Sequence, residues 1–99
     1  MNKKLAALCL LAAPCLVHGY TECTMPLSKV FTDQGGNFLI GTTGYFNGYM
    51  PPNTPGFAAS VAAAIAARAS DRPAVIRYNA NGVNCANVPW NELIDGIGF

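Results

Sequence analysis

Glu92 and Asp95 are a pair of carboxylates close together in the sequence, and carboxylate pairs can perform acid–base chemistry. Two acids hydrolyse glycosides when they are held about 5 to 9.5 Å apart across the scissile bond. No neighbouring motif forces this pair into a cleft, and the other acids, such as Asp33 and Asp71, lie elsewhere in the chain. We therefore interpret these acids as solvated surface charge, and a hydrolase remains the third hypothesis.

The chain contains one histidine, His18, and it lies in a segment that we expect to be removed. Without it, a Ser–His or Cys–His dyad of the usual kind is not expected. Zinc would also lack its common ligands once the cysteines of the mature chain are paired. We predict that the protein is not an enzyme and has no catalytic residue, cofactor or metal site.

The stretch "GYFNGYMPPNTPGF" at residues 44–57 is rich in aromatic rings and contains no Asp, Glu, Lys, Arg, His or Cys. Its rings Tyr45, Phe46 and Tyr49, together with Trp90, are the candidate ligand-binding residues. Flat rings beside neutral amide groups can stack on a sugar, and they also suit a protein interface. The alternative is that these rings cover the core beneath a long loop.

Residues 1–19 have the pattern of a secretory signal peptide. Lys3 and Lys4 precede an apolar run over residues 5–17, and small residues follow. This pattern predicts cleavage after Gly19, which leaves residues 20–99 as a single globular domain.

A lipoprotein is the alternative, because Cys15 follows a Leu-Ala-Ala run, but Pro14 occupies a position that requires a small residue. The Ala-rich stretch at residues 58–69 is too short for a membrane span. We expect a periplasmic or secreted protein without a membrane span.

Two cysteines, Cys23 and Cys85, remain after cleavage. In an oxidising compartment they are predicted to form a disulfide, and two unpaired buried thiols are the alternative. The charged side chains that remain are four basic and five acidic, a net charge of −1. Such a balance gives no basic footprint for nucleic acid.

Two β-rich pieces, Leu27–Thr32 and Phe38–Thr43, flank the turn sequence "DQGGN" and predict a hairpin. A further strand is expected near residues 44–50. Thr54 followed by a proline predicts an N-cap and the start of a helix that runs to about Ser70.

One face of this helix is expected to carry a narrow apolar stripe that ends in a cation, formed by Phe57, Val61, Ala64, Ile65 and Arg68. A strand over Ala74–Tyr78 should follow, then a type I′ turn at Asn81-Gly82 and a closing strand within Glu92–Phe99. The order is β-β-(β)-α-β-β. It indicates an α+β fold with a small antiparallel sheet, or a partly open OB-like barrel with one inserted Ala-rich helix.

The run "DRPAVIRYNANGVNC" after the helix resembles a helix-turn-strand pattern of small secreted bacterial proteins similar to the binding subunits of pertussis-like and subtilase-type A-B toxins. The resemblance covers residues 27–85. It implies a disulfide-bonded OB-like barrel, a homo-oligomeric ring and binding of host glycans. The chain is shorter than typical subunits, and no glycan-binding residue is carried over.

These observations predict an exported, non-catalytic binding module. The first hypothesis is a module that binds a glycan or cell surface through Tyr45, Phe46, Tyr49 and Trp90. Its rival is a periplasmic interaction or inhibitor protein that uses the same loop against a protein partner.

Overall fold

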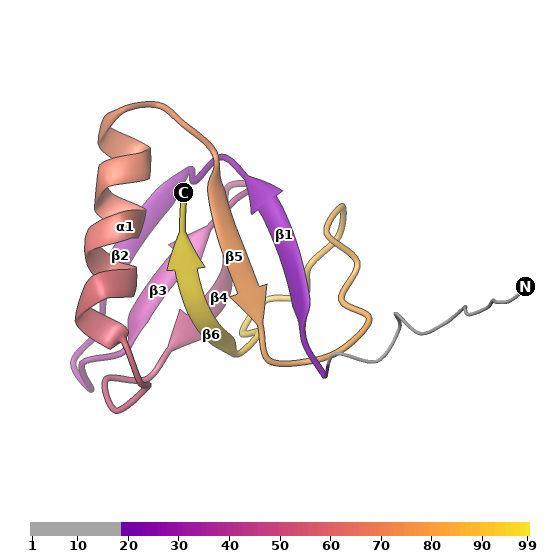
Figure 1. The fold of residues 1–99 in the computed structure, drawn as a ribbon, viewed down its shortest axis with the longest axis horizontal. Helices are drawn as coiled ribbons and strands as arrows, with labels where there is room; N and C mark the ends of the chain where they lie inside the picture. Colours follow the sequence, from indigo (N-terminus) through magenta and orange to yellow (C-terminus); the bar gives the residue numbers. More distant parts are fainter. Residues whose placement is uncertain (1–18) are drawn as a thin grey trace, which may run out of the picture.

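The computed structural model describes residues 19–99, so the predicted signal peptide lies outside the described residues apart from Gly19. The elements of this range are β1 (Thr21–Met25), β2 (Lys29–Thr32), β3 (Phe38–Gly41), β4 (Phe46–Met50), α1 (Phe57–Ala69), β5 (Ala74–Tyr78) and β6 (Ile94–Gly98) (Figure 1). No helix within the described range is long and apolar enough to cross a membrane.

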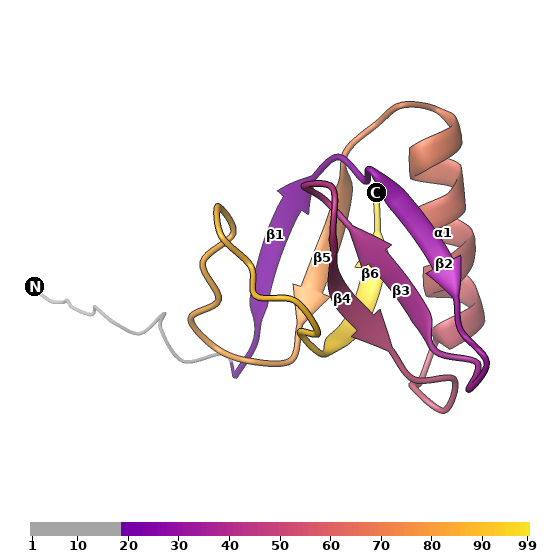
Figure 2. The same cartoon turned by 180° about the vertical axis from the view of Figure 1, so that it is seen from behind.

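The strands form two antiparallel sheets, ordered β1-β5-β6 and β2-β3-β4. The prediction of an α+β fold with small antiparallel sheets and one helix is confirmed. The sheets do not close into a barrel; they meet where Tyr49 and Leu93 form an isolated bridge. Figures 1 and 2 show α1 along one side of the two sheets, beside β6.

The predicted hairpin is confirmed as β2 and β3, which pair from Lys29↔Gly41 to Thr32↔Phe38. Its turn is organised by Asp33, whose Oδ1 accepts the backbone N–H groups of Gly35 at 2.9 Å and Asn37 at 3.0 Å. The Asn37 side-chain amide also donates to Asp33 and lowers the pKa of that carboxyl. Asp33 therefore stabilises the turn of the hairpin.

The strand β1 was not predicted, although it pairs along its whole length with β5. Its sequence TECTM alternates between exposed and buried positions, and Cys23 is the residue that enters the core. The sequence predicts the first strand only from Leu27. The inner face of β1 begins with a polar residue, Thr21, so only Cys23 and Met25 carry the apolar half of the period-two pattern.

The predicted N-cap at Thr54 is wrong. Helix α1 begins at Phe57, and its N-cap is Gly56, which has φ 75° and no side-chain cap. The carbonyl of Thr54 accepts the Phe57 N–H at 3.0 Å. The chain enters the helix through this turn and the left-handed glycine, so the threonine stands too early to cap it.

The buried face of α1 matches the predicted stripe in part, because Ala64 is buried and Phe57 and Val61 pack against the core. Ser60, Ala64 and Ala67 are buried, whereas Ile65 is 52% exposed. The Ser60 Oγ accepts the backbone N–H of Ile97 in β6 at 3.2 Å. Small side chains on this face allow close approach to the strand, and that approach turns the larger isoleucine toward solvent.

The cation that ends the helix, Arg68, reaches the neighbouring sheet. Its Nη2 donates to the backbone oxygen of Ser28, just before β2, at 3.0 Å. The end of α1 is therefore tied to the β2-β3-β4 sheet as well as to β6.

The predicted type I′ turn at Asn81-Gly82 is wrong, because only Gly82 of the pair has a positive φ, 78°. The chain runs instead as a strandless connection from the end of β5 to β6. The Thr21 hydroxyl donates to the Ala80 oxygen at 2.9 Å and accepts the Val83 N–H at 3.0 Å. These bonds hold the connection against β1, and the predicted closing strand follows as β6.

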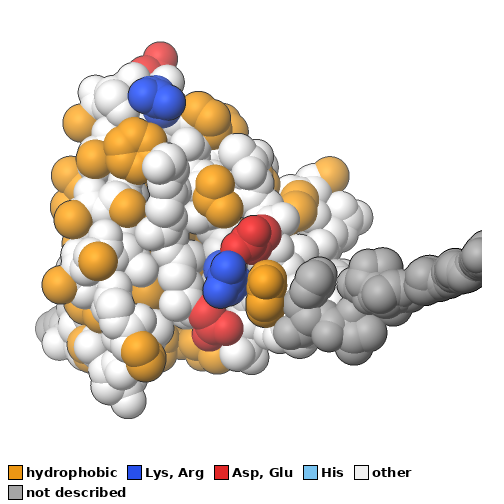
Figure 3. Space-filling view, in the orientation of Figure 1, with side chains coloured by type: hydrophobic (Ala, Val, Ile, Leu, Met, Phe, Trp, Pro, Cys, Tyr) orange, Lys and Arg blue, Asp and Glu red, His pale blue; other side chains and the backbone are white. Residues whose placement is uncertain are grey.

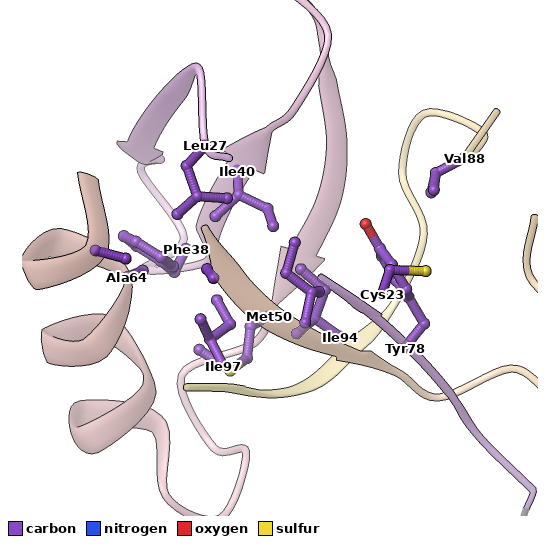
Figure 4. Packing of buried hydrophobic residues seen from close by; sticks show 13 residues of the cluster. Cys23, Leu27, Phe38, Ile40, Met50, Ala64, Tyr78, Val88, Ile94 and Ile97 are labelled. Carbon is purple, nitrogen blue, oxygen red and sulfur yellow. The ribbon is translucent and has the colours of Figure 1, made fainter. Parts of the chain in front are cut away.

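The core lies between the two sheets and α1 (Figure 4). Ile40 and Met50 from one sheet face Ile94 and Ile97 from the other, with Ala64 of the helix at one end. Four of these side chains are completely buried, and Ile97 is 9% exposed. Burying a large aliphatic side chain stabilises a fold by about 1.5 to 3 kcal/mol, so this interface holds the sheets together.

The predicted disulfide is confirmed between Cys23 of β1 and Cys85 of the connection, with the Cα atoms 5.6 Å apart. The first sulfur lies in the core, whereas Cys85 is on the surface. The bond therefore anchors the long connection to the edge strand of the β1-β5-β6 sheet.

Candidate functional site

The four predicted ring residues lie on or beside β4. Phe46 opens this strand and Tyr49 is near its end; both are partly buried. Tyr45 immediately precedes the strand and is 44% exposed, and Trp90, on the long connection, is 73% exposed. None of the four is fully buried, so all present surface to solvent.

Cross-strand register places two of these rings on the outer face of the β2-β3-β4 sheet. Tyr49 pairs with Leu39, which pairs with Phe31, and neighbours across a ladder share a face. Phe46 lies beside them, with its ring centroid 6.0 Å from that of Phe31. The Lys29 Nζ lies 4.8 Å from the centroid of Phe46. The outer face is thus apolar with a cation over one ring.

Two hydrogen bonds hold the segment that carries Trp90 against β4. The Tyr45 hydroxyl donates to the Val88 oxygen at 2.9 Å, and the Tyr49 N–H donates to the Glu92 oxygen at 2.9 Å. The tryptophan lies midway between these two anchors in the sequence. The segment that carries Trp90, distant in the sequence, therefore lies beside the strand that carries Phe46 and Tyr49 and follows Tyr45.

We use the name aromatic surface for Phe31, Tyr45, Phe46, Tyr49 and Trp90. Phe31 is 55% exposed and was missed by the sequence analysis. The signal was present in "KVFT", where Lys29 and Phe31 alternate with Val30, which packs against the core. The sequence predicts the hairpin, and this alternation places Phe31 on the face opposite Val30.

The sequence pair Glu92 and Asp95 does not form one site. Asp95 lines a surface groove on the β1-β5-β6 sheet, and the lining of that groove does not include Glu92. Glu92 lies instead near the buried Tyr78, where burial raises the pKa of the tyrosine hydroxyl to about 12 and the charge of Glu92 adds to this effect. The geometry gives these two carboxylates separate surroundings.

Within residues 19–99, no group of three or more His, Cys, Asp or Glu side chains is placed to hold a metal ion. Comparison of the chain with protein-family models, curated proteins and solved structures finds no match. A functional assignment therefore starts from the chemistry of the side chains themselves.

Proposed function

We propose that the protein is an exported, non-catalytic binding module, and that the aromatic surface binds a glycan. The observation that carries this proposal is that rings with solvent-accessible surface lie on or beside β4, with Trp90 73% exposed and Phe46 and Tyr49 partly buried. Large exposed aromatic groups favour aggregation, and on soluble proteins they often mark a binding surface. The resemblance to toxin binding subunits, with a partly open OB-like arrangement of the sheets and a ring assembly, is part of the same proposal.

The polar groups around these rings suit a hydroxylated ligand. Asn91 follows Trp90, is exposed and has φ 69°, a left-handed conformation that asparagine tolerates better than most residues. Its amide can both donate to and accept from a sugar hydroxyl. Lys29 adds donors over the Phe46 ring. A ring face next to such donors is the arrangement that recognises the apolar and polar sides of a sugar.

The second candidate function is a protein interface on the same surface. The observation that favours it is the apolar outer sheet face, where Phe31 and Leu39 adjoin Phe46 without a carboxylate between them. Aromatic residues are enriched at the centres of such interfaces, and charged ones are depleted. A protein partner would bury Phe31, whereas a glycan would depend on Tyr45 and Trp90.

Truncating the exposed tryptophan tests the proposal directly. We expect the Trp90→Ala variant to bind its glycan about two- to tenfold more weakly, because an aromatic stacking contact contributes about 0.5 to 1.5 kcal/mol. Its melting temperature should stay within about 2 °C of the wild type, since the side chain is largely exposed. A glycan array with the oxidised protein finds the ligand, and calorimetry measures both variants.

The matched control is Ile65→Ala, which removes an exposed apolar side chain from α1, outside the aromatic surface. It should bind the glycan like the wild type. If no glycan binds, or if Phe31→Ala abolishes capture of a protein partner while Trp90→Ala does not, the protein-interface function replaces the glycan-binding one.

A further inference from the structure

The β1-β5-β6 sheet carries a groove of 520 Å³ on its outer face, next to α1. The backbone of Gly96 and Gly98 in β6 contributes to its lining, and Ser60 of the helix lies on one side. Glu22, Arg77 and Asp95 contribute the charged part of its lining. Figure 3 shows this face, where acidic and basic side chains gather beside a white region of backbone and uncharged polar side chains.

The two glycines of β6 are not required by the fold. Neither has a positive φ. A Cβ on Gly98 would meet no atom within 4 Å, and one on Gly96 would lie 3.9 Å from Ser60 Oγ. Glycine inside a strand weakens it, by roughly 0.5 to 1 kcal/mol relative to alanine, and often marks close approach of a ligand. The missing side chains keep the groove open.

Stability measurements can separate these glycines from one that the fold requires. We expect Gly98→Ala to unfold at the same temperature as the wild type or a few degrees higher. Gly41→Ala should melt at least about 4 °C below the wild type, because its Cβ would lie 2.5 Å from the backbone oxygen of Tyr45. Thermal melts of the two variants provide the comparison, and a clear loss for Gly98→Ala would show that the fold does need that glycine.

The side chains that line the groove include two acids and one base, and a second base, Arg72, lies over the ring of the lining residue Phe99 with its Cζ 5.6 Å from the ring centroid. Arg77 is bound to Glu22, with its Nη2 2.6 Å and its Nε 2.9 Å from Oε2. Asp95 accepts hydrogen bonds from the neutral amide of Asn79, at 3.1 and 3.3 Å, and has no ion-pair partner within residues 19–99. A carboxylate accepts several hydrogen bonds, so Asp95 retains the capacity to take a cationic donor.

We propose that this groove binds an amino sugar, with its ammonium group toward Asp95 and Glu22 and its ring over the backbone of Gly96 and Gly98. The carboxylates supply acceptors for the ammonium and for hydroxyl groups, and Arg77 supplies donors. The site is separate from the aromatic surface and does not depend on the function proposed for that surface.

The strand edges at the groove favour this ligand over a basic peptide. An extended peptide gains most of its affinity by adding to a free sheet edge. One edge of β6 pairs with β5, and on the other the N–H of Ile97 is bound to Ser60 Oγ. A ligand over β6 is therefore recognised by the side chains and the shape of the groove rather than by strand pairing. A compact sugar ring with an attached amine suits such recognition.

Calorimetric titration with two matched tetrasaccharides tests the proposal. One probe is the glucosamine tetramer, which carries amine cations, and the other is its neutral N-acetylated form. We expect the cationic tetramer to bind the oxidised protein at least tenfold more tightly. Asp95→Asn should weaken its binding about tenfold, whereas Asp71→Asn, which removes a charge from the turn after α1, should leave it unchanged.

The variant Gly98→Leu fills the groove and should abolish binding while the melting temperature stays near that of the wild type. If that variant does not fold, the comparison of Asp95→Asn with Asp71→Asn decides the question. Equal affinity for the two tetramers, equal effects of the two Asp→Asn variants, binding retained by folded Gly98→Leu, or no binding at millimolar probe would each overturn the proposal. Tighter binding of tetralysine than of the glucosamine tetramer would overturn it in favour of a basic peptide.

Discussion

Removal of the Cys23–Cys85 disulfide should lower the free energy of unfolding by about 4 kcal/mol. The bond joins residues 62 positions apart, and closing a loop of this length restricts the unfolded chain by about that amount. A domain of this size has a total stability of about 4 to 12 kcal/mol. The double variant Cys23→Ala/Cys85→Ala should therefore melt about 20 °C or more below the wild type, which a thermal melt by circular dichroism measures.

Reduction of the wild type provides the control for this prediction. Cys23 is only 1% exposed, so its replacement by alanine also leaves a small gap in the core. The reduced wild type keeps both sulfur atoms and loses only the cross-link. Its melting temperature should fall nearly as far as that of the double variant, and a fall of less than about 5 °C would contradict the loop-closure argument.

The disulfide also links stability to the aromatic surface. Cys85 lies on the connection that carries Val88 and Trp90, and the Tyr45 hydroxyl holds this connection at the Val88 oxygen. The cross-link and this hydrogen bond restrict the same segment from two sides. A ligand that needs Trp90 in place benefits from that restriction, because less entropy is lost on binding.

Local sequence patterns were sufficient for the hairpin, the central strand and the disulfide. Turn residues around Asp33 and the alternation of Val75 and Ile76 are properties of neighbouring residues, and the two cysteines left after the predicted cleavage allow a single pairing. The start of α1 was misplaced because Gly56 turns the chain by a positive φ. A threonine followed by a proline is typical of a helix start, but these two residues do not show that the helix begins only after Gly56.

The buried face of α1 could be found only in part from hydrophobicity. Of the predicted stripe, Ala64 is buried and Phe57 and Val61 pack against the core, but Ile65 is exposed. Ser60 and Ala67, which the periodicity does not select, are buried. The choice depends on how closely the helix approaches β6 and on the hydrogen bond from the Ile97 N–H to Ser60, which are tertiary features. An alanine-rich helix has little hydrophobic contrast between its faces, so small energetic terms decide its rotation.

The candidate sites were predictable only in part. Tyr45, Phe46, Tyr49 and Trp90 were selected because rings cluster in a stretch without charge, and the structure gathers them around β4. The groove has no such signal, because its main feature is the absence of side chains at Gly96 and Gly98. Those glycines become informative only when the register shows that they share an outer face with Arg77 and Val75.

Alkaline pH should destabilise the protein through Tyr78. This residue is completely buried in β5, and its hydroxyl has no hydrogen-bond partner within the described residues. Burial, with the nearby charges of Glu92 and Tyr45, raises its pKa to about 12. An unfolded tyrosine has a pKa of about 10, so the folded state retains the proton over a range in which the unfolded state loses it.

The stabilisation from this retained proton is complete below about pH 10 and is lost as the pH rises through the folded value. A difference of about two pH units corresponds to about 2.7 kcal/mol, which should disappear between about pH 10 and pH 12. Urea unfolding at pH 9, 10, 11 and 12 measures this loss.

The variant Tyr78→Phe isolates the contribution of this hydroxyl, because every other side chain is the same in the two proteins. The difference in unfolding free energy between variant and wild type should be constant up to about pH 10 and then shift in favour of phenylalanine by about 2.7 kcal/mol by pH 12. At neutral pH, phenylalanine should be as stable or about 1 kcal/mol more stable, since a buried hydroxyl without a partner keeps its desolvation cost. Parallel pH profiles would mean that the Tyr78 hydroxyl is solvated in the folded protein.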